Sequence, residues 1–488
     1  MHDSEGMSFS VVKNAVEGAA RVGRLVIPKR QSLDTPNFFG MTSRGAAPHI
    51  TPDNLARHTQ LAGVYMPLED FIETSVRRPV PHIYKAPSAT NGTLNAFTAT
   101  PSSVATIIAP RRHPAVTAPM GNGREFVSIN TSMGFRQLTT EAYCQAVDTL
   151  RPDITIPLAD LTYGYEETKQ KFSTSKRQLR MVERTEDWLS KFFKSLPTGE
   201  DGKPEATHVF APLLPVPYSI QWDYLNTLVE EHLDGLSGLA VYDTNILPDL
   251  EDYKSLQALP RLSLDFLVSP QEILRQTQLG VDMFTVPFIN TTSDSGIALS
   301  FSFPPPAPDA TAGTRPLGID MSSQDHQVSL EPLKEGCPCY ACTKHHRAYL
   351  HHLLSVREML GWTLLQIHNH QVVSDFFAGI RSTIAAGQSI FDENVQLFSR
   401  VYESELPKGT GERPRARGYH FKSEGGQPKI NQPAWEKYRA ENREDPVVAA
   451  ELAGLAATGP AAGGSETPVI PKEAFEDLNK KGFANADK

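Results

Sequence analysis

The middle of the chain alternates short apolar segments with longer segments of helical periodicity. The apolar segments are DITIPLAD (153–160), HVFAPLL (208–214), GLAVYD (238–243), RLSLDFLV (261–268) and VDMFTVPF (281–288), and helical patterns cover 176–196, 221–235 and 269–280. The last helical pattern opens with Ser269-Pro-Gln-Glu272, a capping box with proline at the first helical position. Repeated strand–helix units require a parallel sheet with crossover helices. We therefore predict an α/β fold, with a (β/α)8 TIM barrel as the first choice and a doubly wound sheet as the second.

Composition places the chain among ordinary soluble globular proteins. Of its 488 residues, 40% are hydrophobic and 21% are charged. No apolar run approaches the roughly 18 residues of a membrane span, and the opening MHDSEGMSFS lacks the pattern of a signal peptide. Four cysteines, three of them close together, do not form a secreted disulfide framework, so we expect a cytosolic protein. A net charge of −9 argues against broad nucleic-acid binding but allows a local basic face.

Irregular stretches suggest how the chain is divided. Residues 77–122 and 304–327 are rich in Pro, Ser, Thr and Ala, and we interpret them as inserts in a barrel that spans residues 1–330. Residues 331–402 are predicted to form a separate helical subdomain. From 403 to 488, Gly, Pro, Ala and charged residues dominate, which predicts a mostly disordered tail with a transient helix around Trp435.

Three cysteines in the predicted subdomain, Cys337, Cys339 and Cys342, give the pattern C-x-C-x2-C. Thiolates at this spacing can converge on one zinc ion, which needs a fourth ligand for tetrahedral coordination. The candidate fourth ligands that follow are His345, His346, His351, His352, His368 and His370. The pattern therefore predicts a zinc site, and three unligated thiols or one labile disulfide are the alternative.

Helix geometry limits the choice of histidine. We expect Thr343 to cap a helix that ends near Leu354, and Ser355-Val-Arg-Glu358 to form a second capping box that starts a helix at Val356. One straight helix would carry His368 roughly 40 Å from the cysteines, at about 1.5 Å per residue. A break at Ser355 instead allows a helical hairpin, which brings His368 back toward the cysteine loop.

The same region resembles the zinc subdomain of the tRNA-guanine transglycosylases, with RAYLHHLL and EMLGWTLLQIHNH following the cysteines. Residues 20–55 resemble the family's N-terminal hairpin and first loop, SGLAVYD (237–243) its base-recognition strand, and PRLSLDFLVSPQEIL with GVDMF its late barrel strands. The match spans roughly residues 20–400. It implies one structural zinc ion per chain, held by Cys337, Cys339, Cys342 and the histidine of the H-N pair, His368.

The nucleophile of that family is missing from this chain. The family places an aspartate directly after its G-V-D-x-F block, and this chain has Thr285 there. Base exchange at a ribose C1′ passes through an oxocarbenium-like state, which a carboxylate can attack and stabilise but a neutral hydroxyl cannot. The family's P-T-R-x-G-R segment, whose arginines would hold the wobble region, is replaced by PFINTTSDSG. The resemblance therefore implies that the chain has no catalytic residues.

Other carboxylates give no clear replacement. The family's Asp-Ser-Gly-Gly-Phe loop, with its second catalytic aspartate, has no counterpart between Val80 and Arg136. Asp160 falls near the family's base-binding aspartate but fits a strand-end carboxylate equally well, so the base-binding residues stay unassigned. Asp282 matches an aspartate that is not the nucleophile, and we expect a structural role for it.

The resemblance implies a non-catalytic subunit that pairs with a catalytic homologue. That homologue would exchange guanine for queuine at the wobble position of tRNAs with GUN anticodons. The implied heterodimer forms chiefly through residues 337–370, and the Lys344, His345, His346 and Arg347 cluster lies near the tRNA. The implied location is the cytosol, with peripheral association at the mitochondrial outer membrane.

Two other functions stay open at this stage. The chain could be an active transglycosylase with a relocated carboxylate, such as Asp282 or Asp294. It could also be a zinc-stabilised barrel used as a scaffold, with no part in tRNA modification. Base exchange by the chain alone would favour the first, and failure to bind tRNA or a catalytic homologue would favour the second.

Overall fold

The computed structural model describes residues 6–13, 20–73, 80–89, 92–116, 121–161, 174–199, 204–205, 207–307, 313–411 and 414. Residues 1–426 form one compact unit. The predicted disordered tail beyond residue 414, including the helix expected around Trp435, lies outside the described residues.

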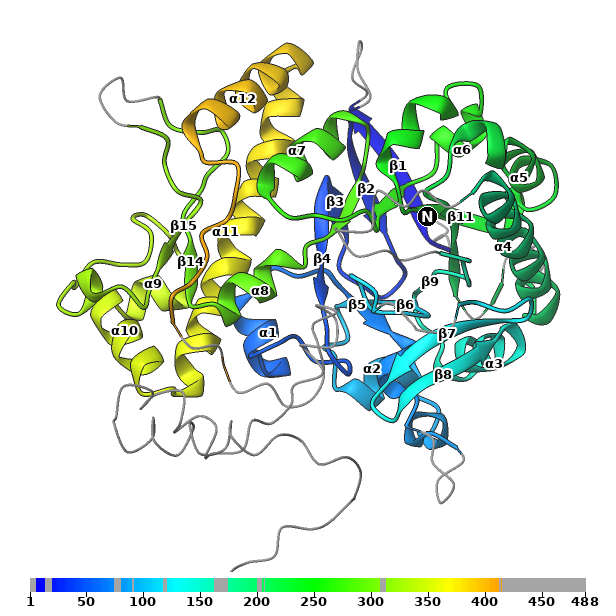
Figure 1. Cartoon of the computed structure of the whole chain (residues 1–488), viewed down its shortest axis with the longest axis horizontal. Helices are drawn as coiled ribbons and strands as arrows, with labels where there is room; N and C mark the ends of the chain where they lie inside the picture. Colours follow the sequence, from blue (N-terminus) through cyan, green and yellow to red (C-terminus); the bar gives the residue numbers. More distant parts are fainter. Residues whose placement is uncertain are drawn as a thin grey trace, which may run out of the picture. The chain divides into compact units, whose positions relative to one another are not determined.

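A closed barrel of eight parallel strands lies at the centre of this unit (Figure 1). Its strands are β4 Asn37–Met41, β5 Gly63–Pro67, β6 Ala105–Ala109, β9 Ile154–Thr155, β10 His208–Leu213, β11 Leu236–Val241, β12 Arg261–Ser263 and β13 Met283–Thr285. They pair in this order, and β13 pairs with β4 to close the ring, with Met283 opposite Asn37. The predicted (β/α)8 barrel is confirmed, and the doubly wound sheet is wrong because such a sheet stays open.

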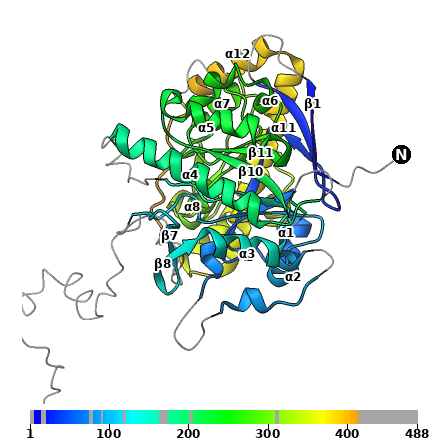
Figure 2. The same cartoon turned by 90° about the vertical axis from the view of Figure 1, so that its right-hand side faces the viewer.

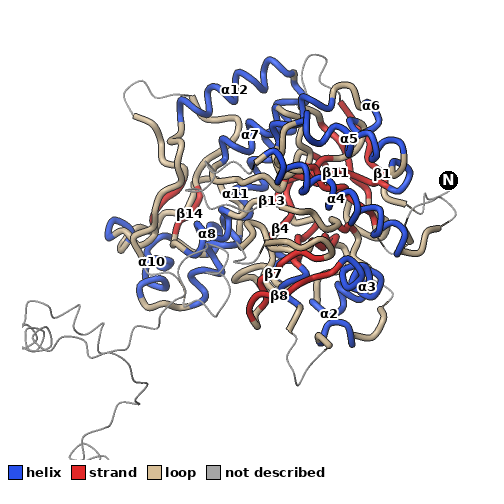
Figure 3. Tube along the Cα trace, turned by 45° about the vertical axis from the view of Figure 1, so that its right-hand side comes forward, coloured by secondary structure: helices blue, strands red, loops and turns tan. Residues whose placement is uncertain are grey.

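The helices that follow the strands form the outer layer of the barrel (Figure 3). They are α1 Pro52–His58, α3 Thr140–Leu150, α4 Ser175–Ser195, α5 Tyr218–Glu230, α6 Lys254–Gln257, α7 Pro270–Gln278 and α8 Phe288–Asp294, with 3-10 turns η1 Leu68–Phe71, η4 Leu233–Gly235 and η5 Thr244–Leu250. The two predicted helices at 176–196 and 221–235 correspond to α4 and α5. Helix α7 begins after Ser269 as predicted, but the Ser269 side chain accepts no capping hydrogen bond within the described structure. No helix in the described part of the chain is long and apolar enough to cross a lipid bilayer.

Four of the five apolar segments predicted as strands are longer than the strands themselves, and GLAVYD has the length of β11 but begins two residues later. After β9, Ile156, Leu158 and Leu161 remain buried although the strand has ended at Thr155. A run of hydrophobic residues indicates that the chain is buried, not that it pairs as a strand. In this barrel the chain stays buried in the loops beyond the last hydrogen-bonded strand pair. Sequence runs therefore locate the strands but overestimate their length.

An antiparallel sheet covers the barrel end where the strands begin. It consists of β1 Ser8–Lys13, β2 Val22–Val26 and β3 Leu33–Thr35, and β3 leads directly into β4. Leu25, Ile27 and Leu33 pack with the barrel-interior side chains, among them Phe39 and Phe210. The barrel interior is therefore a packed core that is closed at this end.

The stretch 77–122 is more regular than its composition indicated. It contains η2 His82–Lys85, α2 Thr93–Thr98 and the barrel strand β6, whose five residues are all buried. The strand was missed because ATIIA is short and lies between Pro- and Ser-rich residues. A hairpin of β7 Phe126–Thr131 and β8 Gly134–Thr139 then precedes α3 (Figure 2).

The helical subdomain packs beside the barrel strands β13 and β4. The predicted range 331–402 contains α9 Tyr340–Lys344, α10 Arg347–Ser355, α11 Met359–Ala386 and α12 Gln388–Val401. Three elements that precede residue 331 pack with these helices, and we include them in the subdomain: β14 Ile297–Leu299, β15 Gly318–Asp320 and η6 Gln324–His326. Helix α11 is the long element of this subdomain and contacts β4, α8 and β14 (Figure 1). Strand β15 lies within 304–327, so this insert too has regular structure among its described residues.

Candidate functional site

The structure brings together the four side chains predicted to bind zinc. The ligand atoms of Cys337, Cys339, Cys342 and His368 all lie within 4.8 Å of one another. His368 Nδ1 is 3.7, 3.5 and 3.4 Å from the sulfurs of Cys337, Cys339 and Cys342, respectively. Tetrahedral zinc with ordinary bond lengths places sulfur and nitrogen ligands about 3.6 Å apart. The four residues therefore fit a tetrahedral metal ion, and all four cysteines of the chain are free thiols, so the disulfide alternative is wrong.

A short helix, a break and a hairpin build this site. Cys339 caps α9, since its sulfur accepts a hydrogen bond from the Cys342 backbone N–H at 3.3 Å. Thr343 was expected to cap a helix but lies inside α9, because the cysteine already fills the capping position. Helix α9 ends after one turn, and His346 caps α10 by accepting from the Tyr349 N–H at 3.2 Å.

The turn between α10 and α11 returns the chain to the cysteines. The predicted capping box at Ser355 is wrong, because Ser355 is the last residue of α10 and Glu358 precedes the first residue of α11. Arg357 adopts φ 62°, a left-handed conformation that ends α10 and reverses the chain. The predicted hairpin is nevertheless present, and it places His368 on α11 opposite the cysteine loop.

A hydrogen bond at the ring nitrogen that faces away from the sulfurs fixes the orientation of the histidine. His368 Nε2 donates to the Leu299 carbonyl oxygen at 2.8 Å, so Nδ1 carries the lone pair that faces the sulfurs. The neighbouring Asn369 holds the same strand, accepting from Leu299 N at 2.9 Å and donating to Ile297 O at 3.0 Å. Hydrogen bonds among the three thiols lower the pKa of Cys342 and raise the pKa of Cys339, because the neighbouring sulfurs compete for the same protons.

Thr285, the residue predicted to occupy the position of the family's nucleophile, is a buried neutral side chain. Thr285 is the last residue of β13, is fully buried, and its hydroxyl donates to the Ser263 carbonyl oxygen at 3.3 Å. This hydroxyl is engaged with the neighbouring strand.

Asp282 is buried at the opposite end of the same strand. Its carboxylate accepts from Arg21 Nε at 2.8 Å, from another Arg21 nitrogen at 2.6 Å and from the Arg261 backbone N–H at 2.8 Å. These contacts tie the N-terminal sheet to the start of β13. The expected structural role of Asp282 is consistent with this arrangement.

Two further carboxylates are also paired. Asp160, beyond the end of β9, is buried and contacts Arg177 and Arg184 at 2.9 Å each, and it accepts from Asn122 at 2.7 Å. Asp294 on α8 contacts His49 Nε2 at 2.6 Å. Neither carboxylate is available as an unpaired base without displacing these partners.

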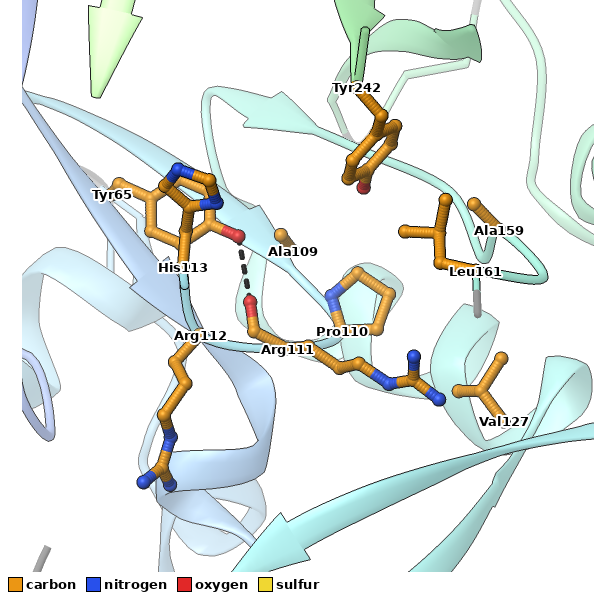
Figure 4. Close-up of a pocket in the computed structure, with 10 residues that line it drawn as sticks. All are labelled: Tyr65, Ala109, Pro110, Arg111, Arg112, His113, Val127, Ala159, Leu161 and Tyr242. Carbon is orange, nitrogen blue, oxygen red and sulfur yellow. Dashed lines mark hydrogen bonds between the residues drawn. The ribbon is translucent and has the colours of Figure 1, made fainter. Parts of the chain in front are cut away.

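A small pocket opens where the barrel strands end (Figure 4). Tyr65 and Tyr242 come from β5 and from the end of β11, and the Tyr65 hydroxyl donates to the Arg111 carbonyl oxygen at 2.7 Å. The ten described residues that line it include no aspartate or glutamate. Burial lowers the pKa of His113 to about 4, so this lining imidazole is neutral near pH 7. The described lining of the pocket therefore offers no acidic nucleophile.

The residues predicted to lie near tRNA have different environments. Lys344 is exposed. Arg347 donates to the Pro332 carbonyl oxygen at 2.9 Å and pairs with Glu331 at 2.9 Å, which makes it a brace for that loop. His345 stacks on Tyr349 with ring centroids 5.3 Å apart, and His346 is the helix cap described above. Lys344 is therefore the member of this cluster best placed to meet a polyanion.

Helical spacing predicts an apolar stripe on this subdomain, formed by Tyr349, Leu350, Leu353 and Leu354 with Trp362, Leu364 and Leu365 on the returning helix. Five of these side chains, Leu350, Leu353, Trp362, Leu364 and Leu365, are buried. A different group of apolar side chains is exposed. Its members lie on α9, in the loop that pairs with the first turn of α10, or at the turn between α10 and α11: Val328, Leu330, Tyr340, Val356, Met359 and Leu360. Val328 is 86% exposed and Leu330 is 76% exposed. Single loop residues carry no periodic signal, so only the folded chain shows that these side chains are exposed. We call these six residues the apolar patch.

Comparisons with known proteins agree with the geometry. The family model described as Queuine tRNA-ribosyltransferase matches residues 16–404. "Queuine tRNA-ribosyltransferase accessory subunit 2" of Schizosaccharomyces pombe is 36% identical over 425 residues, which cover 85% of this chain and 89% of the relative. Proteins with the same name from Drosophila mojavensis and Aedes aegypti are 27% and 24% identical, over 78% and 82% of this chain and 89% and 94% of the relatives. The chain belongs to the queuine tRNA-ribosyltransferase family.

Proposed function

We propose that this chain is the non-catalytic subunit of a queuine tRNA-ribosyltransferase, which exchanges guanine for queuine at the wobble position of tRNAs with GUN anticodons. The name that its relatives carry, accessory subunit 2, supports this assignment. In the proposed division of work, a catalytic homologue performs the exchange and this chain completes the complex.

The observation that carries the proposal is the buried threonine at the end of β13. Base exchange needs a carboxylate close to the ribose C1′, because positive charge develops there as the glycosidic bond breaks. Thr285 is neutral, fully buried and hydrogen-bonded to Ser263. Within the described structure, the two carboxylates considered as substitutes, Asp282 and Asp294, are held by Arg21 and His49. The arrangement therefore disfavours an active enzyme with a relocated carboxylate.

We propose zinc as the metal of the Cys3His cluster. Cys337, Cys339, Cys342 and His368 would hold it, and bound zinc would supply a rigid cross-link between the cysteine loop and α11. Four protein ligands leave no open position for water, which is the coordination of a structural site. The chain's own residues set the geometry, since Leu299 orients His368 and the Cys339 cap positions Cys342.

The proposed partner is a catalytic homologue that docks on residues 337–370 and the adjoining apolar patch. Monomeric proteins seldom expose several large apolar side chains in one region unless that region binds a partner. Tyr340, Met359 and Leu360 are 39%, 57% and 43% exposed and lie within this range. We place Lys344 near the tRNA that the two subunits share. We also propose a cytosolic location, with peripheral association at the cytosolic face of the mitochondrial outer membrane.

The test compares the purified chain, a purified catalytic homologue and the two together. Labelled guanine or queuine and a GUN tRNA are supplied, and incorporation into the tRNA is measured. We expect no incorporation by this chain alone and full activity only for the co-purified pair. Guanine exchange by the wild-type chain alone would contradict the assignment, and failure to bind either tRNA or the homologue would favour an unrelated scaffold.

A further inference from the structure

The chain beyond α12 is held as a strap along the β14–β15 ribbon. The sequence assigned residues 403–411 to the tail, but they run back past β14 and β15 toward α8 (Figure 1). At the start of the strap, Arg315 N donates to Val401 O at 2.7 Å and Glu403 N donates to Arg315 O at 2.9 Å. The Tyr402 hydroxyl accepts from Ser302 N at 3.2 Å. Composition could not show these contacts, because they join segments that are about a hundred residues apart in the sequence.

Three consecutive residues, Gly409, Thr410 and Gly411, fasten the far end of the strap. The Thr410 backbone N–H and hydroxyl both donate to one carboxylate oxygen of Asp320, at 2.8 and 2.6 Å. A Cβ at Gly409 would overlap the Ser295 carbonyl oxygen, and a Cβ at Gly411 would overlap the Ser322 hydroxyl. Glycine is therefore needed at Gly409, where the obstructing atoms are backbone, whereas at Gly411 the obstructing atoms belong to a side chain that can shift.

The ribbon under the strap is the element that orients the metal-binding histidine. Asp320, at the end of β15, lies opposite Ile297 in β14. The other edge of β14 faces α11, where Leu299 O accepts from His368 Nε2 and Leu299 N donates to Asn369. One residue after β15, Met321 O contacts His351 Nδ1 on α10 at 2.9 Å. The ribbon thus lies between the strap and the two helices of the metal site.

We infer that residues 402–411 act as a clamp, which holds the β14–β15 ribbon against α10 and α11 and thereby controls retention of the metal ion. Two strands of three residues form a ribbon that is unstable alone, so it depends on the elements that cover its edges. When the strap is released, local opening of the ribbon frees Leu299 and the His368 ring loses its orientation. Because α10 borders the apolar patch, the same release weakens pairing, a consequence that rests on the proposed function.

The test uses the full chain loaded with zinc and a double variant, Gly409→Ala with Thr410→Val. The matched control is Gly313→Ala, because a Cβ at Gly313 meets nothing within 4 Å and the residue lies near the same ribbon. Zinc transfer to a chromogenic chelator is timed at neutral pH. We expect transfer to be about tenfold faster in the double variant, the lower end of the effect of lost outer contacts on metal affinity, and unchanged in the control. Thr410→Val alone, which adds no steric overlap, should shift the rate in the same direction by less.

Equal transfer rates in the double variant, Thr410→Val and the control overturn the inference. Co-purification with the catalytic homologue is measured in parallel. If zinc transfer is faster in the double variant but pairing is undiminished, the clamp is supported. The expected effect of strap release on pairing is then overturned. If the wild-type chain does not pair at all, the proposed function fails, while the zinc-transfer rates still decide whether the strap acts as a clamp.

Discussion

The end of the barrel where the strands terminate, which we call the mouth, differs from the metal site in how its polar side chains are paired. At the mouth, Asp160 is neutralised by two arginines and Thr285 donates to a backbone carbonyl. At the metal site, three thiols and one imidazole converge with their ligand atoms facing one another. The first region offers a buried hydroxyl and a paired carboxylate, and the second offers four converging ligand atoms. The contrast supports the proposed non-catalytic role of this chain.

The largest effect is expected at the metal site, when one metal ligand is removed. Cys339→Ser removes both a ligand and the sulfur that caps α9, so zinc should fall from about one ion per chain to near zero. The hairpin of α10 and α11 should lose stability, and pairing with the catalytic homologue should be lost. Metal analysis and co-purification measure these outcomes.

A double variant provides the stricter check of the ligand set. Cys339→Ser with His368→Ala leaves two thiols, which cannot complete a tetrahedral site. Stoichiometric zinc in this variant would show that other residues bind the metal. A zinc-free variant that still pairs fully would place the partner surface on another face of the barrel.

The second largest effect is expected at the closed end of the barrel. Arg21→Ala removes the ion pair and both side-chain hydrogen bonds that hold the fully buried Asp282 carboxylate, and it removes two bonds to backbone carbonyls. Breaking a buried pair in this way costs about 3–5 kcal/mol in the free energy of unfolding. Urea denaturation measures this loss.

The same N-terminal sheet offers a matched control. Arg24 pairs with Asp34, but both side chains are at least half exposed. Arg24→Ala should leave the free energy of unfolding close to that of the wild type, because exposed pairs contribute little. A similar loss in both variants would show that Asp282 is not specifically dependent on Arg21.

Sequence reasoning located the metal site and the barrel better than it located the contacts around them. The cysteine spacing predicted a zinc site at Cys337, Cys339 and Cys342, because ligand spacing is a local constraint, and the family resemblance assigned His368 as the fourth ligand. The pairing of Asp160 with Arg184, the strap on Asp320 and the apolar patch depend on residues that are distant in sequence or isolated in loops. Periodicity and motifs carry no information about such contacts.

Acid should destabilise the mouth through His113. Burial lowers the pKa of His113 to about 4, and an unfolded histidine titrates near 6.5. As the pH falls from 6.5 to 4, protons therefore bind the unfolded chain first, and the free energy of unfolding falls by about 3 kcal/mol in total. The Asp265 charge opposes this effect by favouring the protonated ring. Above pH 6.5 the contribution is constant.

His113→Gln removes this titration and isolates it from protonation of the metal ligands, which both proteins share. Urea denaturation of the wild type and the variant is compared at pH 7 and pH 5. The wild type should lose about 2 kcal/mol more than the variant over this interval. An equal loss in both proteins would mean that His113 is accessible to protons in the folded chain.

The smallest effect is expected at Thr285, the residue predicted to occupy the position of the family's nucleophile. Thr285→Val removes one hydrogen bond, from the buried hydroxyl to Ser263 O, and leaves that carbonyl without this donor. The cost is about 1 kcal/mol in the free energy of unfolding, and queuine incorporation by the heterodimer should not change.

Thr285→Asp places a carboxylate at the nucleophile position, but the chain still lacks the acid–base and substrate-binding segments identified as missing from its sequence. We therefore expect no exchange by the Thr285→Asp chain alone, together with a larger loss of stability, because the new charge is buried next to a carbonyl oxygen. Detectable exchange would show that the mouth retains the rest of its catalytic arrangement, and the contrast between the two regions would then reduce to one side chain.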